Sequence, residues 1–331
     1  MTNKTNIKKS IELYNEGLAC GKKKDFKSAE NFYLKAIKLN SEFFQAYYNL
    51  GNINKNSGKL NEAVTYFKKS IQIKSDFINA YYNLGNTLKM LGKLDESEDN
   101  FNKVLKFNPN LEEAKENLQI INELRELKSI VKPFKNKECS ISNTNTFKTF
   151  RNVEPDLIDE LYKIRTLELD KSGLYDARYG NGKFSNFELL QNESTVIKKV
   201  KYDLINIMEE AVKAKIYIKE SFFNIFKTGS GVRSHAHFSD FDKNMGYENQ
   251  KFSLTYYLSV GDQKSSEPGI LNLYDPKKEI LPSNGLLLIF PATQKHAASY
   301  NGKEDRIMIG INFYSYKWWC PRTDSNRGPI D

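Results

Sequence analysis

The sequence predicts two domains of different class: an α-solenoid of helical repeats, followed by a mainly β domain, a sandwich or jelly roll with flanking helices. Three observations predict this. The chain has 331 residues, more than one domain usually contains. Its first third repeats at a fixed interval of 34 residues. Its last third consists of short β-rich runs separated by turn residues.

Composition narrows the class of protein. The formal net charge is +9, but Lys and Arg are dispersed among Glu and Asp, which favours a solvated surface over nucleic-acid binding. No apolar leader opens the chain, and the longest apolar run, Leu286 to Phe290, is too short to cross a membrane. Cys20, Cys139 and Cys320 are widely spaced, which indicates reduced thiols. We therefore expect a soluble, cytoplasmic protein with no membrane partner.

An internal repeat dominates residues 1–128. Its clearest copies are A-Y-Y-N-L-G-N-I-N-K-N-S-G-K-L-N-E-A at 46–63 and A-Y-Y-N-L-G-N-T-L-K-M-L-G-K-L-D-E-S at 80–97. Apolar residues recur at helical spacing, and Gly58 and Gly92 mark the turns between helices. The pattern predicts about three helix pairs from 7 to 110 and a terminal helix over 111–128 that covers the stack. Two further series at the same spacing are Gly17, Gly51 and Gly85, and Asn15, Asn49 and Asn83.

These residues closely resemble the tetratricopeptide repeat, a helix pair with a 34-residue period. The resemblance implies a short solenoid whose first helices form a groove for a protein or peptide. Asn15, Asn49 and Asn83 look like the asparagines with which some members of the family hold the backbone of a ligand. The alternative is that asparagine is merely frequent in this repeat. Residues 129–147 then lose the helical period and gain Ser, Asn and Thr, so we expect a linker there.

The second domain is expected over residues 148–317. Two helices are predicted first, at 154–166 and 195–213, and the period then changes from helix to strand. Many short strands at this spacing favour a β-sandwich or jelly roll. Residues 318–331 have no period, and we expect an unstructured tail without a function. The predicted strands are 221–227, 232–238, 252–260, 270–274, 286–290 and 306–314.

All three histidines of the chain lie in this second domain. His235 and His237 are separated by one alanine, and residues two apart on a strand face the same way, about 7 Å from each other. His296 follows the apolar run 286–290. A lone histidine is more often structural, but this concentration favours a metal site.

Five segments within 220–316 look like the iron(II)- and 2-oxoglutarate-dependent dioxygenases, particularly their prolyl-hydroxylase-like branch. They are G-S-G-V-R-S-H-A-H-F, K-F-S-L-T-Y-Y-L-S, P-G-I-L-N-L-Y-D-P, G-L-L-L-I-F-P-A-T-Q-K-H and D-R-I-M-I-G-I-N-F. The resemblance implies a double-stranded β-helix, a jelly roll that binds iron through H-x-D/E and a distant histidine. It also implies Fe(II), 2-oxoglutarate and dioxygen, with ascorbate as a further cofactor, and hydroxylation of a protein, peptide or small molecule.

Carried over to this sequence, His235 becomes the first metal ligand and His296 the last. His237 occupies the position where the family has a carboxylate, so we expect it to be the second ligand. Three neutral imidazoles should weaken the affinity for a hard ion but favour an anionic cosubstrate. Asp240 or Asp242 is the alternative second ligand, which would require a bend after the strand.

Other positions of the cosubstrate pocket follow from the same resemblance. Arg306 matches the basic residue that pairs with the far carboxylate of 2-oxoglutarate, for which a guanidinium is well suited. Tyr257 and Asn224 match polar pocket positions, although a tyrosine at a sheet rim and an asparagine at a strand edge explain them as well. Met308 lies two residues after Arg306, at a position where the family often has a hydroxyl side chain. The segment 240–250 is polar and is interpreted as a mobile lid loop.

Two other functions are consistent with the same residues. Three histidines on a jelly roll also build cupin-like metal centres, such as zinc sites, that are not oxygenases. Such a site has no need of Arg306. The second domain would alternatively be a decayed enzyme that serves only as a binding or scaffold protein.

Overall fold

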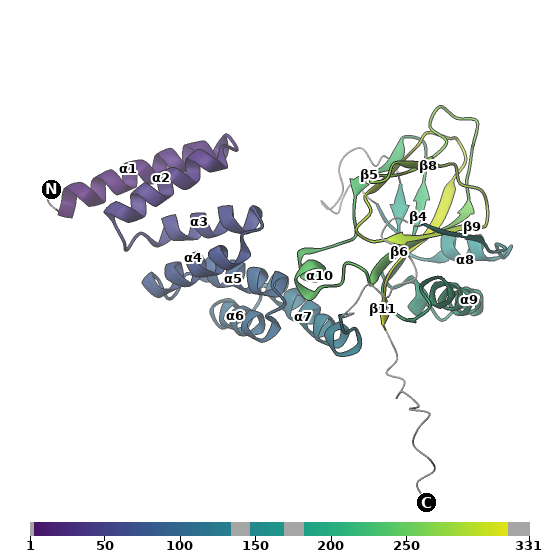
Figure 1. The fold of residues 1–331 in the computed structure, drawn as a ribbon, viewed down its shortest axis with the longest axis horizontal. Helices are drawn as coiled ribbons and strands as arrows, with labels where there is room; N and C mark the ends of the chain where they lie inside the picture. Colours follow the sequence, from purple (N-terminus) through teal and green to yellow (C-terminus); the bar gives the residue numbers. More distant parts are fainter. Residues whose placement is uncertain (1–2, 134–145, 169–181, 317–331) are drawn as a thin grey trace, which may run out of the picture. The chain divides into compact units, whose positions relative to one another are not determined.

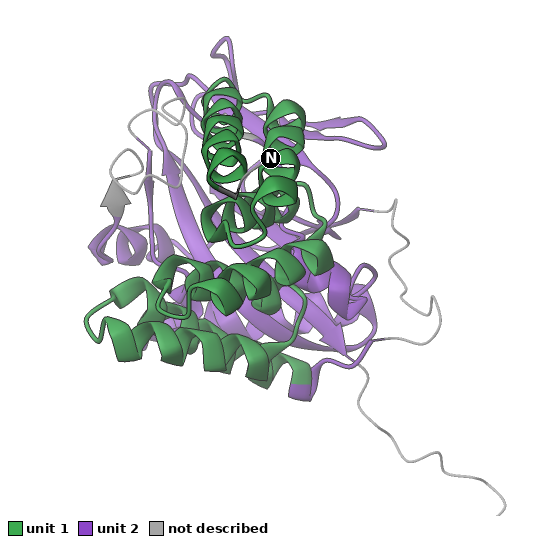
Figure 2. Cartoon of the chain, turned by 90° about the vertical axis from the view of Figure 1, so that its left-hand side faces the viewer, with its two compact units in different colours: residues 1–128 green, residues 129–331 purple. Residues whose placement is uncertain are grey.

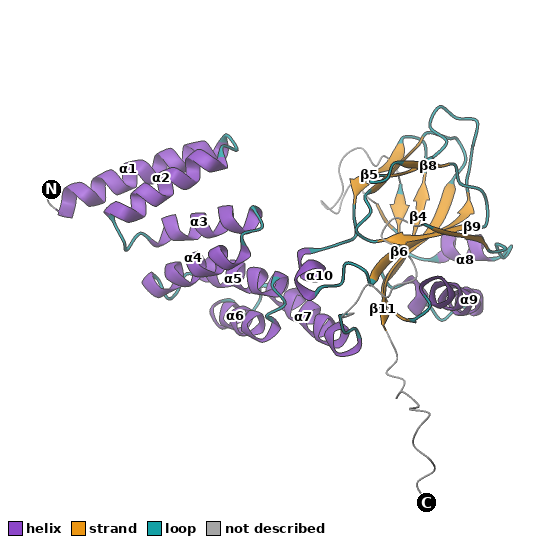
Figure 3. Ribbon diagram, in the orientation of Figure 1, coloured by secondary structure: helices purple, strands orange, loops and turns teal. Residues whose placement is uncertain are grey.

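A computed structural model describes residues 3–133, 146–168 and 182–316. The chain divides into two compact units, residues 1–128 and 129–331 (Figure 2). The first unit is helical, and the second contains the strands (Figure 3). Most of the predicted linker, at 134–145, and the predicted tail at 318–331 lie outside the described residues. None of the described helices combines the length and the hydrophobicity that crossing a bilayer requires.

The first unit consists of three helix pairs and a seventh helix, which confirms the predicted solenoid (Figure 1). Gly58 and Gly92 have φ angles of +74° and +71° and form the turns inside the second and third pairs. Lys24 takes the same conformation in the first pair, with φ of +62°. The helices are α1 (Asn3–Lys22), α2 (Phe26–Leu39), α3 (Phe44–Asn56), α4 (Leu60–Ile73), α5 (Ile78–Met90), α6 (Leu94–Phe107) and α7 (Glu112–Ile130).

Small residues bring the two helices of each pair together. A Cβ atom on Gly51 would lie 2.5 Å from the ring of Phe67, so only glycine permits this close approach. Ala29 and Ala63 are fully buried on the second helices. The 34-residue spacing of glycine therefore reflects repeated contact with one aromatic ring per pair. The equivalent contacts are Gly17 with Tyr33 and Gly85 with Phe101.

The second unit contains two antiparallel sheets. The larger has the order β1-β9-β6-β11-β4-β3-β2, and the smaller has the order β5-β10-β7-β8. Neighbouring strands in both sheets are antiparallel. The strands are β1 (Phe147–Phe150), β2 (Leu167–Glu168), β3 (Lys183–Phe184), β4 (Lys215–Phe226), β5 (Ser230–His235), β6 (Lys251–Ser259), β7 (Leu271–Leu273), β8 (Lys278–Ile280), β9 (Leu286–Pro291), β10 (His296–Tyr300) and β11 (Arg306–Tyr316).

Helices α8 (Leu157–Lys163) and α9 (Thr195–Val212) pack on one face of the larger sheet through a shared apolar core. Successive side chains of β6 point to opposite faces of the larger sheet. Its residues Phe252, Leu254, Tyr256 and Leu258 join the core under the helices. Tyr257 instead belongs to the cluster that includes Leu271 and Leu273 of the smaller sheet. A short 3-10 helix, η2 (Leu189–Gln191), completes the layer.

The structure corrects several predicted elements. β5 ends at His235 and does not continue to 238. The segment 240–250 begins as a helix, α10 (Asp240–Met245), because Ser239 and Asp242 form a reciprocal capping box. It is therefore not the loop that the sequence predicted. β8 and β10 were not predicted, because K-E-I is charged and H-A-A-S-Y lacks both alternation and branched residues.

Candidate metal centre

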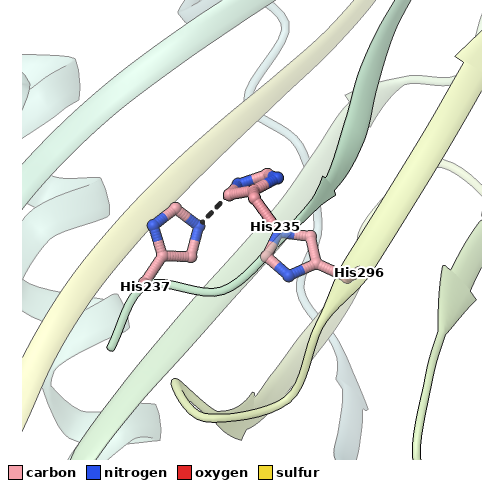
Figure 4. A group of neighbouring side chains, drawn as sticks. All are labelled: His235, His237 and His296. Carbon is pink, nitrogen blue, oxygen red and sulfur yellow. Dashed lines mark hydrogen bonds between the residues drawn. The ribbon is translucent and has the colours of Figure 1, made fainter. Parts of the chain in front are cut away.

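The three histidines converge on one point in the second unit (Figure 4). One ring nitrogen from each lies within 4.8 Å of the others, and no other such group of His, Cys, Asp or Glu occurs among the described residues. His235 Nε2 and His237 Nε2 are 3.3 Å apart. Two imidazole nitrogens bound to one metal, each at about 2.1 Å, lie about 3 to 3.4 Å apart at tetrahedral or octahedral angles. The spacing of this pair therefore fits a shared ion.

Sheet register and a backbone hydrogen bond position the three rings. His235 ends β5 and is paired with His296, the first residue of β10. His237 lies beyond the strand, where its backbone N–H donates to the carbonyl of Ala292 at 3.0 Å. The sequence predicted one straight strand that carries both histidines; instead, β5 ends at His235 and the chain bends before His237. The two side chains still point to the same site, as expected.

Burial keeps two of these rings neutral. It lowers the pKa of His237 to about 2 and that of His296 to about 3, with a smaller contribution from the neighbouring imidazoles. Neutral rings carry the lone pair that a metal needs. His296 Nδ1 lies 3.4 Å from the carbonyl of Gln294, which can only accept, so this nitrogen carries the hydrogen and Nε2 is left for a ligand.

Neither candidate aspartate belongs to this group. Asp242 is fully buried, but its Oδ2 accepts from Ser239 and from Lys251 Nζ at 2.8 Å. Its Oδ1 accepts from Tyr314. Asp240 is the exposed first residue of α10. The structure therefore brings His237, and neither aspartate, to the other two histidines.

Arg306 lies in the same cavity of about 270 Å³ as the histidines. Its side chain is 1 % exposed, and its Nη1 donates to the carbonyl of Gly269. Its Nε and Nη2 atoms are buried and have no hydrogen-bond partner in the described part of the chain. A buried guanidinium with two unused donors is unfavourable unless an anion completes it. Burial lowers the pKa of Arg306, but an arginine stays charged at neutral pH.

The other predicted pocket residues also line this cavity. Tyr257 is buried with its ring centroid 5.0 Å from the Arg306 guanidinium carbon, and burial raises its pKa, so the phenol stays protonated. Asn224 on β4 is paired with Met308 on β11, and both side chains line the cavity. The cavity thus contains the three histidines and the Arg306 guanidinium. Apolar side chains line much of the rest, together with the polar side chains of Glu220, Asn224, Ser253, Thr255, Tyr257 and Asn312.

Sequence reasoning assigned no role to four residues at this site, although it placed Ser253 on the pocket face of its strand. Asn312 contacts His237, and Glu220 and Ser253 contact Asn312. Gly269 has φ of +80°, and a Cβ atom there would lie 1.2 Å from Arg306 Nη1. The only signal for Gly269 was its place in P-G-I-L-N-L-Y. Ser253 and Asn312 likewise lie in the quoted segments K-F-S-L-T-Y-Y-L-S and D-R-I-M-I-G-I-N-F, and Glu220 lies in none of them. The sequence gives no role to these three residues, because their contacts depend on pairing between distant strands.

In the repeat unit, the predicted asparagines form contacts within the protein. Asn49 Nδ2 donates to Tyr14 Oη at 3.2 Å, and Asn83 Nδ2 donates to Tyr48 Oη at 2.9 Å. Asn15 is exposed on α1. Asn117 on α7 repeats the pattern with Tyr82, a member of the series that sequence reasoning missed.

Two lysines belong to the same row of first helices. Lys55 Nζ donates to Asn83 Oδ1 at 2.9 Å, and Lys89 Nζ donates to Asn117 Oδ1. Burial lowers the pKa of both lysines. Neither forms a salt bridge with a carboxylate among the described residues. The first helices therefore carry two half-buried ammonium groups whose described hydrogen-bond partners are neutral amide oxygens.

Comparison with known proteins identifies the first unit. Family models described as tetratricopeptide repeat match residues 13–43, 32–65 and 78–111, and one described as TPR repeat matches 55–92. The amino-terminal unit is thus a solenoid of repeats of a kind that mediates protein interaction. More particularly, it consists of tetratricopeptide repeats, as its sequence predicted. Among curated proteins, none matches the chain.

Several solved structures are similar to part of the chain. The first TPR of Spaghetti (RPAP3), bound to HSP90 peptide SRMEEVD, is 21% identical, covers 36% of this chain and 95% of its own, and has a TM-score of 0.35. The Arabidopsis OM64 TPR domain is 25% identical, with 36% and 98% covered and a TM-score of 0.34. MamA is 21% identical, with 36% and 70% covered and a TM-score of 0.35.

Proposed function

We propose that the second unit is an iron(II)- and 2-oxoglutarate-dependent oxygenase that hydroxylates a substrate, and that the repeats bind a polypeptide. The observation that carries the enzymatic part is a single cavity that contains both the three-histidine group and the unsatisfied guanidinium of Arg306. A metal centre alone does not require a buried arginine. A metal centre that also binds a dicarboxylate needs a cation such as Arg306 to pair with the carboxylate that does not contact the metal.

The strand order supports a jelly roll, the double-stranded β-helix that the resemblance implies. From β4 to β11 the chain passes back and forth between the two sheets. β4, β6, β9 and β11 lie in the larger sheet, while β5, β7, β8 and β10 lie in the smaller one. A jelly roll is built from eight strands in two such sheets. The histidines lie on the smaller sheet and on the connection after β5.

The donor set fits a divalent iron. Imidazole is a ligand that iron(II) accepts readily, and three neutral rings leave the charge of the ion to be balanced by an anion. His235, His237 and His296 would hold the metal, and Arg306 with Tyr257 would hold the far carboxylate of 2-oxoglutarate. Iron with 2-oxoglutarate and dioxygen supplies the oxidation, in which a substrate C–H bond becomes C–OH and 2-oxoglutarate is converted to succinate and carbon dioxide.

The chain itself contributes binding, orientation and exclusion of water. Arg306 offers two unused N–H groups in one fork, which matches the two oxygens of a carboxylate. The protonated Tyr257 phenol is a donor in the same cavity. Apolar side chains such as Phe226, Leu271 and Met308 line the rest of the cavity and lower its polarity, which strengthens these interactions.

The first experiment is an anaerobic Fe(II) titration with and without 2-oxoglutarate. We expect the weak visible metal-to-ligand band when both are present, and succinate release when air is admitted. Arg306→Ala should lose the band at the same 2-oxoglutarate concentration while it still binds metal. Stoichiometric zinc binding with no band and no succinate would contradict the oxygenase and favour the cupin-like metal centre.

For the repeats, we propose that the row of first helices holds an acidic polypeptide segment. Lys55 and Lys89 supply two half-buried cations whose partners are neutral amide oxygens. A carboxylate is a stronger partner for an ammonium group than an amide is. RPAP3 is a related case in which such repeats hold a peptide. Whether that polypeptide is also the substrate is decided by testing the bound peptide for a mass increase of one oxygen.

A further inference from the structure

We infer that Asn312 is a positioning residue of the metal centre, whose carboxamide sets the orientation and the tautomer of His237. This inference rests on the proposed metal site. It begins from three contacts behind His237, on the side away from His235. Asn312 Nδ2 lies 3.2 Å from His237 Nδ1 and 2.8 Å from Glu220 Oε2. Asn312 Oδ1 accepts from Ser253 Oγ at 2.8 Å.

The sheet fixes this arrangement. Asn312 lies on β11 and is paired with Glu220 on β4 and with Ser253 on β6. Both partners of its carboxamide are thus its own cross-strand neighbours. Asn312 is 3 % exposed, so its carboxamide must form its hydrogen bonds within the protein. All three side chains line the cavity that contains the histidines.

The neighbours of the carboxamide determine which way it faces. A carboxylate only accepts hydrogen bonds, so the group of Asn312 that faces Glu220 must be its NH₂ group. The same NH₂ group faces His237 Nδ1, which must then accept. A neutral imidazole has one hydrogen, so in this state it lies on Nε2 and points to His235 Nε2, 3.3 Å away. The metal-free site is therefore closed by a hydrogen bond between two of its own ligands.

Metal binding requires the opposite tautomer of His237. Nε2 must present its lone pair, so the hydrogen moves to Nδ1, and the ring keeps one hydrogen throughout. Nδ1–H then needs an acceptor, as metal-bound histidines nearly always have. A half-turn of the Asn312 carboxamide offers its oxygen. The Ser253 hydroxyl both donates and accepts, so it satisfies either orientation, and the partly exposed Glu220 can turn towards solvent.

The test is a Co(II) titration of the full chain followed by its visible d–d spectrum. Asn312→Leu keeps the shape but removes the acceptor, and should weaken cobalt binding roughly 10- to 100-fold and change the spectrum. Asn312→Asp supplies an acceptor in every orientation and should bind cobalt at least as tightly as the wild type. Asn301→Leu, the same exchange at an exposed position of this unit, is the control and should match the wild type.

The outcomes separate this role from the site itself. Wild-type affinity and spectrum in a folded Asn312→Leu protein would overturn the role of Asn312 alone. If Asn312→Leu does not fold, weaker cobalt binding by folded Asn312→Asp would overturn it instead. Absence of cobalt binding by the wild type would overturn the metal centre, and the role of Asn312 with it. Circular dichroism establishes folding in each case.

Discussion

His235 and His296 lie directly opposite each other on antiparallel strands β5 and β10, with ring centroids 4.3 Å apart. β10 also pairs with β7 on its other side, so this cross-strand pair lies inside the smaller sheet. His237 follows β5 and is held by its backbone bond to Ala292 and by Asn312. Sheet register therefore fixes two of the three proposed ligands, while the position of the third depends on one backbone hydrogen bond and on its contact with Asn312.

His237→Ala should lower the affinity for Fe(II) by at least about tenfold, because one of the three proposed ligands is lost. Removing a residue that only hydrogen-bonds to a metal ligand already costs this much. Asp240→Ala should leave it unchanged, because Asp240 is exposed at the start of α10. Anaerobic titration of both variants with 2-oxoglutarate present measures the difference. The reverse ranking would assign the second ligand to the aspartate.

Gly269→Ala should weaken 2-oxoglutarate binding and leave metal binding intact. The added methyl group would lie 1.2 Å from Arg306 Nη1, so the guanidinium must leave its place. Gly229→Ala is a matched control, because Gly229 has a similar φ of +78° but nothing within 4 Å of the added Cβ. Cosubstrate titration of the Fe(II)-loaded variants checks this. Equal loss in both variants would attribute the effect to backbone strain.

The metal-free second unit should lose stability as the pH falls below about 6.5. The pKa of His237 is lowered to about 2 and that of His296 to about 3, so the unfolded chain binds protons that the folded unit does not. Stability is therefore full above the unfolded pKa and decreases as the pH drops towards the folded one. Between pH 6.5 and pH 5, each histidine should lower the free energy of unfolding by about 1 to 2 kcal/mol.

Hydrogen exchange of β5 and β10 in the presence of a chelator measures this decrease in stability. The double variant His237→Asn, His296→Asn is the control and should show a flat response over the same range. An equal pH dependence in both proteins would mean that other groups cause it.

The sequence predicted the repeats well because their signals are local. Gly51 must face Phe67, and the spacing of such contacts is visible as a period in the chain. The convergence of His235 and His237 was also predicted, although the reason was different. The prediction assumed one straight strand, whereas β5 ends at His235 and the chain then bends.

Pairing between distant strands accounts for what the sequence did not show. β10 carries His296, but H-A-A-S-Y has no strand pattern of its own and becomes a strand only between β5 and β7. The contacts of Asn312 with Glu220 and Ser253 depend on the register of three strands. A single sequence has no local signal for such a register.

Lys55→Gln with Lys89→Gln should weaken binding of an acidic peptide to the repeats by roughly tenfold, because two charge-assisted hydrogen bonds become neutral ones. Lys27→Gln with Lys106→Gln removes the same charge from exposed positions of α2 and α6 and should change binding little. Fluorescence anisotropy with a glutamate-rich peptide measures both. Equal weakening by the two pairs would indicate a general charge effect and would contradict a site on the first helices.

Gly51→Ala should destabilise the repeat unit, while Gly21→Ala should stabilise it. Alanine improves helix propensity by about 1 kcal/mol at either position. At Gly51 the added Cβ would lie 2.5 Å from the fully buried ring of Phe67, an overpacking that costs about 1 to 3 kcal/mol or more. At Gly21 the nearest atom, the hydroxyl of Tyr33, is 4.0 Å away, so only the gain remains. Thermal unfolding followed by helical circular dichroism compares the two. A loss of stability in Gly21→Ala as large as that in Gly51→Ala would contradict the explanation of the 34-residue glycine spacing by helix crossing.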